Sequence, residues 1–339
     1  MLKKLTALTL ILTLAATCLY GCSNVKEGEG TQQAPAQTEA PGNEGEAEAP
    51  TAETKTPGEK YKIAFIVKSL QSAFFINMVE AAEQCGRDYA DKIEVETMAP
   101  QTPFNIEEQI QLVEQCITNQ VDAIVIAPCD SEGIVPAIEK ANNAGILVVT
   151  ANTKANGGDI VSYVGAQNYD VGYSLAVALF EKLGGQGDVV LIEGKAGNST
   201  SEERTAGFKA ALEEYPGITL LASQPADWDR ASAMTVAENC LQTYDKIDGM
   251  LTLTKDMGLG ALEAIKSAGR EEEIVSMTFD VDEDVNAALA SGALYASGNQ
   301  NEQSQAYIAI MTAVFALDGY AVSSEQIMPI SVVTAEDLN

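Results

Sequence analysis

The single tryptophan of the chain, Trp228, lies in a loop rich in charged residues, 222–230 (ASQPADWDR). An apolar run at 218–221 predicts a strand before the loop, and residues 231–241 predict a helix after it. Open α/β sheets bind ligands where strand ends lead into helices. An indole can cover the C–H face of a flat, hydroxylated ligand while neighbouring charged groups bind its hydroxyls. The loop alone equally allows Trp228 to close the edge of the sheet instead.

The chain contains no histidine among its 339 residues. Ser-His-Asp and Cys-His catalysis and histidine-containing metal sites are therefore excluded. The G-x-G-x-x-G and G-x-S-x-G motifs are missing, and Gly194-Lys195 is no phosphate loop because Ala196 follows the lysine. We expect a protein that is not an enzyme and that uses no cofactor and no metal.

Acidic residues outnumber basic ones by 49 to 20, which gives a formal net charge of −29. Nucleic acid and anionic membrane surfaces are poor partners for such a chain. Attraction of a cation would be a functional use of this acidity. Solubility of an exported protein explains the charge more simply, and we favour that interpretation.

Residues 1–22 predict an export signal. Two lysines precede the apolar run 5–16, which is too short for a secure membrane span. The sequence Leu-Tyr-Gly-Cys that ends at Cys22 resembles the lipobox of bacterial lipoproteins, in which the cysteine takes the lipid; a plain secretory signal is the alternative. Residues 23–59 are rich in Glu, Ala, Pro, Gly and Thr, and predict a disordered acidic linker between a lipid anchor and the globular body.

Four cysteines lie beyond the signal and form no C-x-x-C pair. Scattered cysteines of this kind are more often small buried apolar side chains than metal ligands. In an exported chain a disulfide is neither excluded nor indicated by their spacing. They are Cys85, Cys116, Cys129 and Cys240.

Beyond residue 60 the sequence alternates short β-type runs with amphipathic helical segments, which is typical of parallel α/β sheets. In the first half we expect strands at 62–67, 93–99, 123–127, 147–151 and 162–165, and helices at 73–90, 106–119 and 133–144. In the second half we expect strands at 188–192, 219–222, 249–253, 274–279, 294–297 and 327–333, and helices at 167–183, 199–214, 231–243, 257–268, 282–291 and 302–317. Two such halves predict two doubly wound parallel-sheet lobes with a ligand cleft between them.

Several separated segments carry a more specific signal. They are KSLQSAFF at 68–75, LIEGKAGNSTSEERTAGF at 191–208, LASQPADWDR at 221–230, the strand end MTFD at Asp280 and ASGNQN around Gln300. Together they resemble the type I periplasmic sugar-binding proteins of ABC importers, in the ribose, allose and galactose group, and most of all its allose-binding members. The resemblance covers about residues 61–334.

The resemblance implies the periplasmic-binding-protein type I fold, in which three crossings of the chain form a hinge between the lobes. The N-terminal lobe would hold residues 60–166 and 301–329, and the C-terminal lobe residues 167–300 and 330–339. The crossings would lie at 165–168, 297–301 and 328–331.

The resemblance also implies the roles of the site residues. Phe75 would stack on one face of the ligand and Trp228 on the other, with Phe74 beside Phe75. The hydroxyls would be bound by Lys68, Asn152, Arg204, Asp280 and Gln300, of which Gln300 would lie at the hinge.

Each role has an alternative that the sequence leaves open. Phe74 begins a helix, and we expect it to belong to the core. Arg204 follows two glutamates, and in the alternative interpretation it forms only an ion pair with them at the surface, which contributes little to stability. Asp280 would merely cap the helix 282–291.

The chain departs from the family pattern at several candidate site residues. Ser72 stands where members usually carry Asn, Asn152 where they carry an acidic residue, and Thr254-Lys255 where they carry Asn-Asp. These replacements change which hydroxyls are bound and argue against ribose and allose themselves. A sugar or polyol remains the expected ligand.

The sequence therefore predicts an extracytoplasmic solute-binding lipoprotein, monomeric and anchored to the cell membrane through Cys22. It would capture a monosaccharide (a hexose, pentose or polyol) by lobe closure and deliver it to the permease of an ABC importer. The alternative is a sensor that presents the sugar to a membrane signalling protein. A repressor of the same fold is disfavoured by the export signal.

Overall fold

The computed structural model describes residues 59–338, which belong to one compact unit of the chain. The predicted signal peptide at 1–22, the predicted lipidation site Cys22 and nearly all of the predicted linker at 23–59 lie outside the described residues. Among the helices of residues 59–338, none combines the length and the apolar character that a membrane crossing requires.

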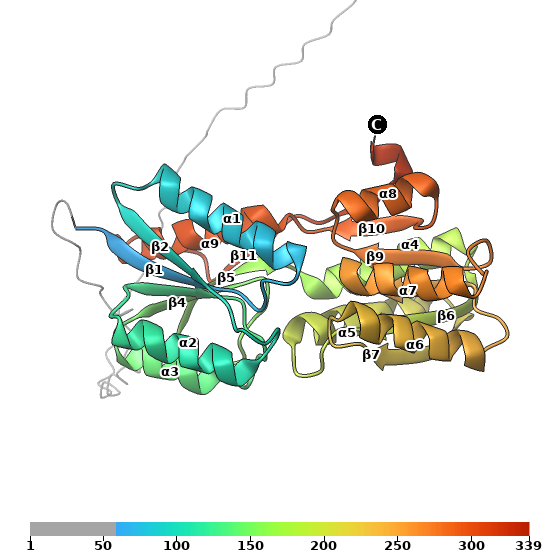
Figure 1. The fold of residues 1–339 in the computed structure, drawn as a ribbon, viewed down its shortest axis with the longest axis horizontal. Coiled ribbons are helices and arrows are strands. Elements are labelled where there is room, and N and C mark those ends of the chain that lie inside the picture. The colour runs from blue at the N-terminus through green and yellow to red at the C-terminus, as the bar shows by residue number, and fades with distance from the viewer. Residues whose placement is uncertain (1–58, 339) are drawn as a thin grey trace, which may run out of the picture. The chain divides into compact units, whose positions relative to one another are not determined.

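The first sheet is wholly parallel, with the strand order β11-β5-β4-β3-β1-β2. Its strands are β1 (Tyr61–Ile66), β2 (Ile93–Met98), β3 (Ala123–Ile126), β4 (Leu147–Ala151), β5 (Ile160–Ala166) and β11 (Glu325–Met328). The central strands are apolar on both faces because helices cover both. Ile63 and Phe65 pack under α1 (Ala73–Asp88) and α9 (Glu302–Leu317). Ala64 and Ile66 pack under α2 (Ile106–Thr118) and α3 (Val135–Asn143), on the opposite face (Figure 1).

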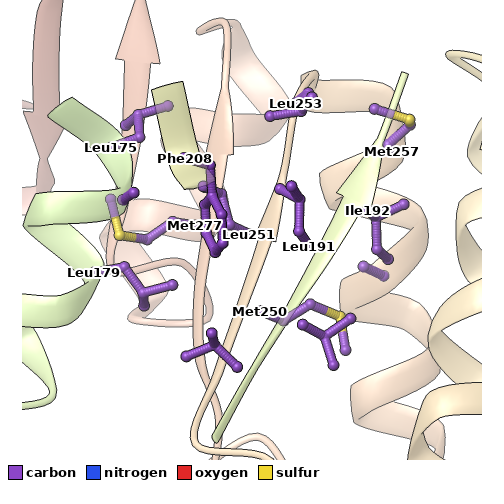
Figure 2. Close-up of a cluster of buried hydrophobic side chains, with 14 of the residues drawn as sticks. Leu175, Leu179, Leu191, Ile192, Phe208, Met250, Leu251, Leu253, Met257 and Met277 are labelled. Carbon is purple, nitrogen blue, oxygen red and sulfur yellow. The ribbon is translucent and has the colours of Figure 1, made fainter. Parts of the chain in front are cut away.

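The second sheet has the order β12-β10-β9-β8-β6-β7, parallel except where β12 pairs with β10. Its strands are β6 (Gln186–Glu193), β7 (Gly217–Pro225), β8 (Gly249–Thr252), β9 (Val275–Phe279), β10 (Ala296–Asn299) and β12 (Ser331–Thr334). Its helices are α4 (Asn168–Lys182), α5 (Ser199–Glu214), α6 (Arg230–Thr243), α7 (Lys255–Ser267), α8 (Glu283–Ser291) and the short η1 (Ala335–Leu338). The core of this lobe packs Leu175 and Leu179 of α4, Phe208 of α5 and Met257 of α7 around the central strands (Figure 2).

The predicted fold class, two doubly wound parallel-sheet lobes, is confirmed. The chain passes between the sheets three times: from β5 to α4, from β10 to α9 and from β11 to β12. The single final strand predicted at 327–333 is wrong, because β11 and β12 belong to different sheets. Pro329 lies between them and has no N–H to continue a ladder.

Helices α4 and α5 touch backbone to backbone through two glycines. A Cβ at Gly172 would lie 1.9 Å from the carbonyl oxygen of Arg204, and one at Gly207 would lie 2.0 Å from the carbonyl oxygen of Tyr169. No side chain fits at either position. This close contact fixes the position of α5 along α4, and with it the position of Arg204.

We expect Gly172→Ala to lower the free energy of unfolding by about 1–3 kcal/mol, because the added methyl group forces the two helices apart. Chemical denaturation would measure the change. Ala206→Ser is the control, since it adds one atom to an exposed position of α5. Equal stability of Gly172→Ala and the wild type would contradict this packing.

Candidate functional site

A pocket lies between the lobes, with about 440 Å³ of empty space, part of it open to solvent. All ten residues that the sequence placed at the site line this pocket, although their contact with a ligand remains a prediction. They are Lys68, Ser72, Phe74, Phe75, Asn152, Arg204, Trp228, Thr254, Asp280 and Gln300. Four further lining residues were not predicted: Phe104, Thr200, Lys255 and Asp256.

Aromatic rings from the first lobe form one wall of the pocket. The Phe75 ring meets Phe74 edge-on at 5.1 Å between centroids and Phe104 at 6.1 Å. Phe74 belongs to the core under α1, as expected, and also reaches the pocket. Phe104 precedes α2 in a left-handed conformation, with φ 58°, and no sequence pattern marks it.

Trp228 supplies an aromatic side chain from the second lobe. Asp227 and Trp228 are both left-handed, with φ of 53° and 65°. The indole packs on Gly194, where a Cβ would lie only 2.1 Å from the ring. Trp228 is 7% exposed and belongs to the apolar core of its lobe as well as to the pocket lining. Trp228 therefore both packs in the core and faces the pocket, and its stacking on a ligand remains a prediction.

The charged neighbours of Trp228 are not among the residues that line the pocket, so nothing in the structure supports the expectation that they bind ligand hydroxyls. Asp229 caps α6 by accepting a hydrogen bond of 2.7 Å from the backbone N–H of Ser232. Arg230 pairs with Glu263 on the surface. Local capping and solvent exposure direct these side chains outward.

Arg204 is held in a fixed orientation at the pocket floor, 1% exposed. Its Nε donates to Asn168 Oδ1 at 2.9 Å, one terminal nitrogen to the Leu253 carbonyl at 2.7 Å, and the other to Gln300 Oε1 at 3.3 Å. Its guanidinium lies 4.0 Å from the centroid of the Phe279 ring. The alternative of a surface ion pair is wrong. Burial lowers the pKa of Arg204 to about 10, so it stays charged at neutral pH.

Asp280 directly follows β9 in a left-handed conformation, with φ 78°, and is 4% exposed. It accepts a hydrogen bond of 2.7 Å from Gln300 Nε2. It does not cap the following helix, because Asp282 does so through the backbone N–H of Val285. Burial raises the pKa of Asp280 to about 7, against the opposing effects of Arg204 and the Gln300 hydrogen bond.

Lys68 lies near the start of the loop between β1 and α1 and is 2% exposed. Its Nζ donates to Thr153 Oγ1 and, at 3.4 Å, to Asn152 Oδ1, and it lies 5.6 Å from the centroid of the Phe75 ring. Burial, more than any neighbouring charge, lowers the pKa of Lys68 to about 7. Asn152 Nδ2 in turn approaches Gln300 Oε1 at 3.5 Å.

These contacts join five side chains into one hydrogen-bonded series, which we call the polar row. It runs from Lys68 of the first lobe through Asn152 to Gln300 at a crossing between the lobes. Gln300 in turn contacts two residues of the second lobe: its side-chain oxygen accepts from Arg204, and its side-chain nitrogen donates to Asp280. The row can offer donors at both ends and a carboxylate at one.

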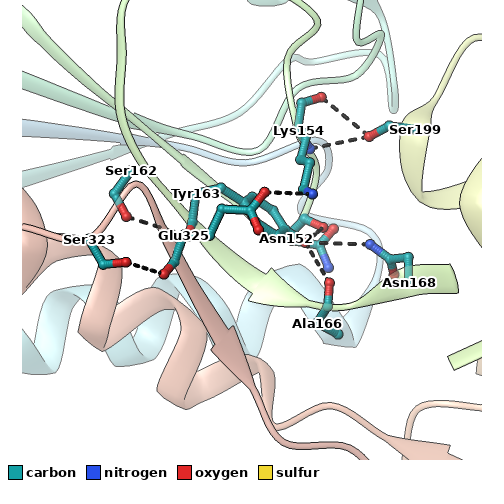
Figure 3. Close-up of polar contacts among 9 residues, drawn as sticks. All are labelled: Asn152, Lys154, Ser162, Tyr163, Ala166, Asn168, Ser199, Ser323 and Glu325. Atoms are coloured by element: carbon teal, nitrogen blue, oxygen red, sulfur yellow. Dashed lines mark hydrogen bonds and ion pairs between the residues drawn. The ribbon is translucent and has the colours of Figure 1, made fainter. Parts of the chain in front are cut away.

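Direct contacts also join the lobes around the pocket. Ser72 donates to Asp256 at 3.0 Å, and the hydroxyls of Thr153 and Thr200 lie 2.9 Å apart. Ser199 accepts a hydrogen bond of 3.2 Å from the backbone N–H of Lys154 (Figure 3). The lobes are therefore closed on each other in this structure.

Of the residues missed, Thr200 lies inside the segment 191–208 that carried the resemblance. Lys255 and Asp256 begin α7 directly after Thr254, and the buried Lys255 forms an ion pair with the partly exposed Asp282.

The four cysteines of the described residues are buried and free, in line with their interpretation as apolar side chains. In residues 59–338, no three Cys, Asp or Glu side chains are grouped in a way that would hold a metal ion.

Residues 63–321 match a family described as periplasmic binding protein domain. The D-ribose/D-allose-binding protein of Pseudomonas aeruginosa is 31% identical over 83% of this chain and 91% of its own length. An ABC transporter periplasmic solute binding protein from Actinobacillus succinogenes, solved with bound D-allose, has a TM-score of 0.78 and is 29% identical. The match covers 82% of this chain and 99% of that protein's chain. An ABC transporter solute binding protein from Bacillus halodurans, solved with bound myo-inositol, has a TM-score of 0.78 and is 26% identical. The match covers 83% of this chain and 96% of that protein's chain.

The fold, the pocket between two lobes and these matches define a solute-binding protein of two-lobed type. The chain belongs to the periplasmic binding protein family.

The raised pKa of Asp280 makes its effect on stability dependent on pH. The folded state holds this proton up to about pH 7, whereas the unfolded chain releases it near pH 4. The folded protein thus binds more protons between these values, and Asp280 lowers stability progressively as the pH rises from 4 to 7.

Asp280→Asn removes this titration and keeps an acceptor for Gln300. We expect its melting temperature, relative to the wild type, to improve steadily from pH 4 to pH 7.5. Differential scanning calorimetry across this range would measure the trend. Asp284→Asn, an exposed position on α8, is the control. A difference that stays constant with pH would argue against the buried, protonated carboxyl.

Proposed function

We propose that this protein captures a monosaccharide or polyol outside the cytoplasm and delivers it to the permease of an ABC importer. The observation that carries the proposal is the pocket in which rings from both lobes accompany the polar row. Aromatic walls suit the C–H faces of a sugar, and charged or amide groups suit its hydroxyls. The ligands named for the similar proteins, allose, ribose and myo-inositol, support it.

Two further polar atoms of the pocket lining favour a hydroxylated ligand. Trp228 Nε1 and Thr254 Oγ1 are buried without a hydrogen-bond partner among residues 59–338. Buried polar groups are rarely left in this state in the functional form of a protein. Ligand hydroxyls would satisfy both atoms.

In this proposal the three crossings act as hinges between lobes of residues 60–166 plus 301–329 and 167–300 plus 330–339. The solute binds to the open form, and closure then brings Lys68 and Arg204 into one row around it. Closure changes the outer faces of both lobes together, which lets a permease distinguish the loaded form from the empty one. No bond of the solute is broken, so no catalytic residue is needed.

The affinity follows from a few contacts of known size. Each stacking contact contributes about 0.5–1.5 kcal/mol beyond burial, and each hydrogen bond to a charged group about 1.5–3 kcal/mol. Six or seven such contacts, less the ordering cost, give roughly −8 to −10 kcal/mol, a dissociation constant between about 1 μM and tens of nM.

The cellular setting is also part of the proposal. The protein would be a monomeric lipoprotein, anchored through Cys22 at the extracytoplasmic face of the membrane, with residues 23–59 as a tether. The export signal and the acidic low-complexity segment in the sequence support this arrangement.

Trp228 is the only tryptophan and lines the pocket, so intrinsic fluorescence should change when the solute binds. We expect saturable titrations with at least one member of a panel of monosaccharides, sugar acids and polyols. Phe75→Ala should weaken that binding at least tenfold, because it removes the stacking surface. Phe315→Ala, an exposed ring on α9, is the matched control. If no member of the panel changes the fluorescence of Trp228, the proposed ligand class is wrong.

A further inference from the structure

The two buried cations of the polar row lack an acidic partner. In residues 59–338, no carboxylate oxygen comes within ion-pair distance of Lys68 or Arg204, whose hydrogen bonds go to amide, hydroxyl and carbonyl oxygens. Lys255, the third buried cation of the pocket, does have such a partner in Asp282. Burial of an ammonium group without an anion is unfavourable unless something supplies the missing charge.

The shortage of negative charge is greater at the Lys68 end of the row. Asp280 acts electrostatically on Arg204 and shares Gln300 with it. The ionisable groups that act on Lys68 are Cys129, Arg204 and Lys195. Two of these are cations, and burial raises the pKa of the Cys129 thiol to about 12, which keeps it neutral. Lys68 therefore faces only neutral or positive neighbours.

The neutral acceptors around Lys68 do not use all of its hydrogen-bonding capacity. An ammonium has three N–H donors, and two of them are directed to Thr153 Oγ1 and Asn152 Oδ1. Lys68 lines the pocket, so the remaining donor is available to a solute.

From this charge distribution we infer that the preferred solute is a sugar acid, an aldonate or uronate, whose carboxylate binds Lys68 in the first lobe. Its hydroxyls extend along Asn152 and Gln300 toward Asp280. This inference rests on the proposed function and assigns an orientation as well as a ligand class. A phosphate fits less well, because its second negative charge would meet only one unpaired cation at this end and a carboxyl group at the other.

The same groups give the binding of a sugar acid a pH dependence. The pKa of Lys68 is about 7 without solute, so its ammonium form is lost as the pH rises above 7. Asp280, whose pKa is also about 7, gains a negative charge over the same range, beside Arg204, Lys255 and Glu302. Both changes disfavour a carboxylate. Affinity for a sugar acid should therefore fall from pH 6 to pH 8.5, whereas affinity for a neutral sugar should not fall in this way.

Isothermal titration calorimetry of the purified protein with matched pairs tests the inference. The pairs are D-glucose with D-gluconate and D-glucuronate, D-galactose with D-galacturonate, and D-ribose with D-ribonate. At pH 6 we expect at least one acid to bind ten times more tightly than its neutral parent. We also expect proton uptake on binding at pH 8, visible as a dependence of the heat on the buffer.

Two substitutions should remove this preference. Lys68→Met deletes the cation, and Asn152→Asp gives Lys68 a carboxylate within the protein. Each should reduce the preference for the acid at least tenfold, and Asn152→Asp tests the inference even if Lys68→Met fails to fold. Lys209→Met, an exposed position on α5, removes one positive charge away from the pocket and should change nothing.

The outcomes separate this inference from the proposed function. Neutral sugars that bind as tightly as every matched acid, or an acid preference that survives Asn152→Asp, would overturn the inference and leave a sugar-binding protein. If neither neutral sugars nor sugar acids bind, both the inference and the proposed function are wrong.

Discussion

The removal of charged side chains from water is the constraint on which the site depends. Arg204, Lys68 and Asp280 are almost wholly buried at the pocket between the two lobes, and in each case burial is the main cause of the shifted pKa. The amide groups of Asn152 and Gln300 connect them without adding charge. The result is a preorganised set of donors and acceptors in surroundings of low polarity, where each interaction with a solute is strong.

Backbone strain is concentrated at this pocket. In residues 59–338, the non-glycine residues with positive φ are Phe104, Gln120, Asn152, Asp227, Trp228, Asp280 and Asn301. Four of them, Phe104, Asn152, Trp228 and Asp280, line the pocket, and Asn301 follows Gln300. The rigid sheets and the close α4–α5 contact stabilise this strain, which persists only where the surrounding structure enforces it.

Periodicity alone predicted most of the fold, because buried parallel strands are continuous apolar runs and their helices carry one apolar face. Periodicity failed at 327–333, where one apolar run includes the end of β11 in the first sheet and the start of β12 in the second. The candidate site came mainly from motif resemblance, which identified positions such as Arg204 and Asp280. Phe104 was missed because a loop residue approaches the pocket only through the tertiary fold. The outward direction of Arg230 likewise depends on Glu263, 33 positions away.

The polar row also explains how a solute could stabilise the closed form. Lys68 and Asn152 belong to the first lobe, Arg204 and Asp280 to the second, and Gln300 to a crossing between them. Beside the pocket, Lys154 of the first lobe pairs with Glu325 of the same lobe, and its backbone N–H donates to Ser199 of the second lobe (Figure 3). In the closed form without an anion, Lys68 is buried among neutral and positive groups. A carboxylate on the solute would offset that penalty only in the closed form, so ligand charge and lobe closure would be coupled through a single side chain.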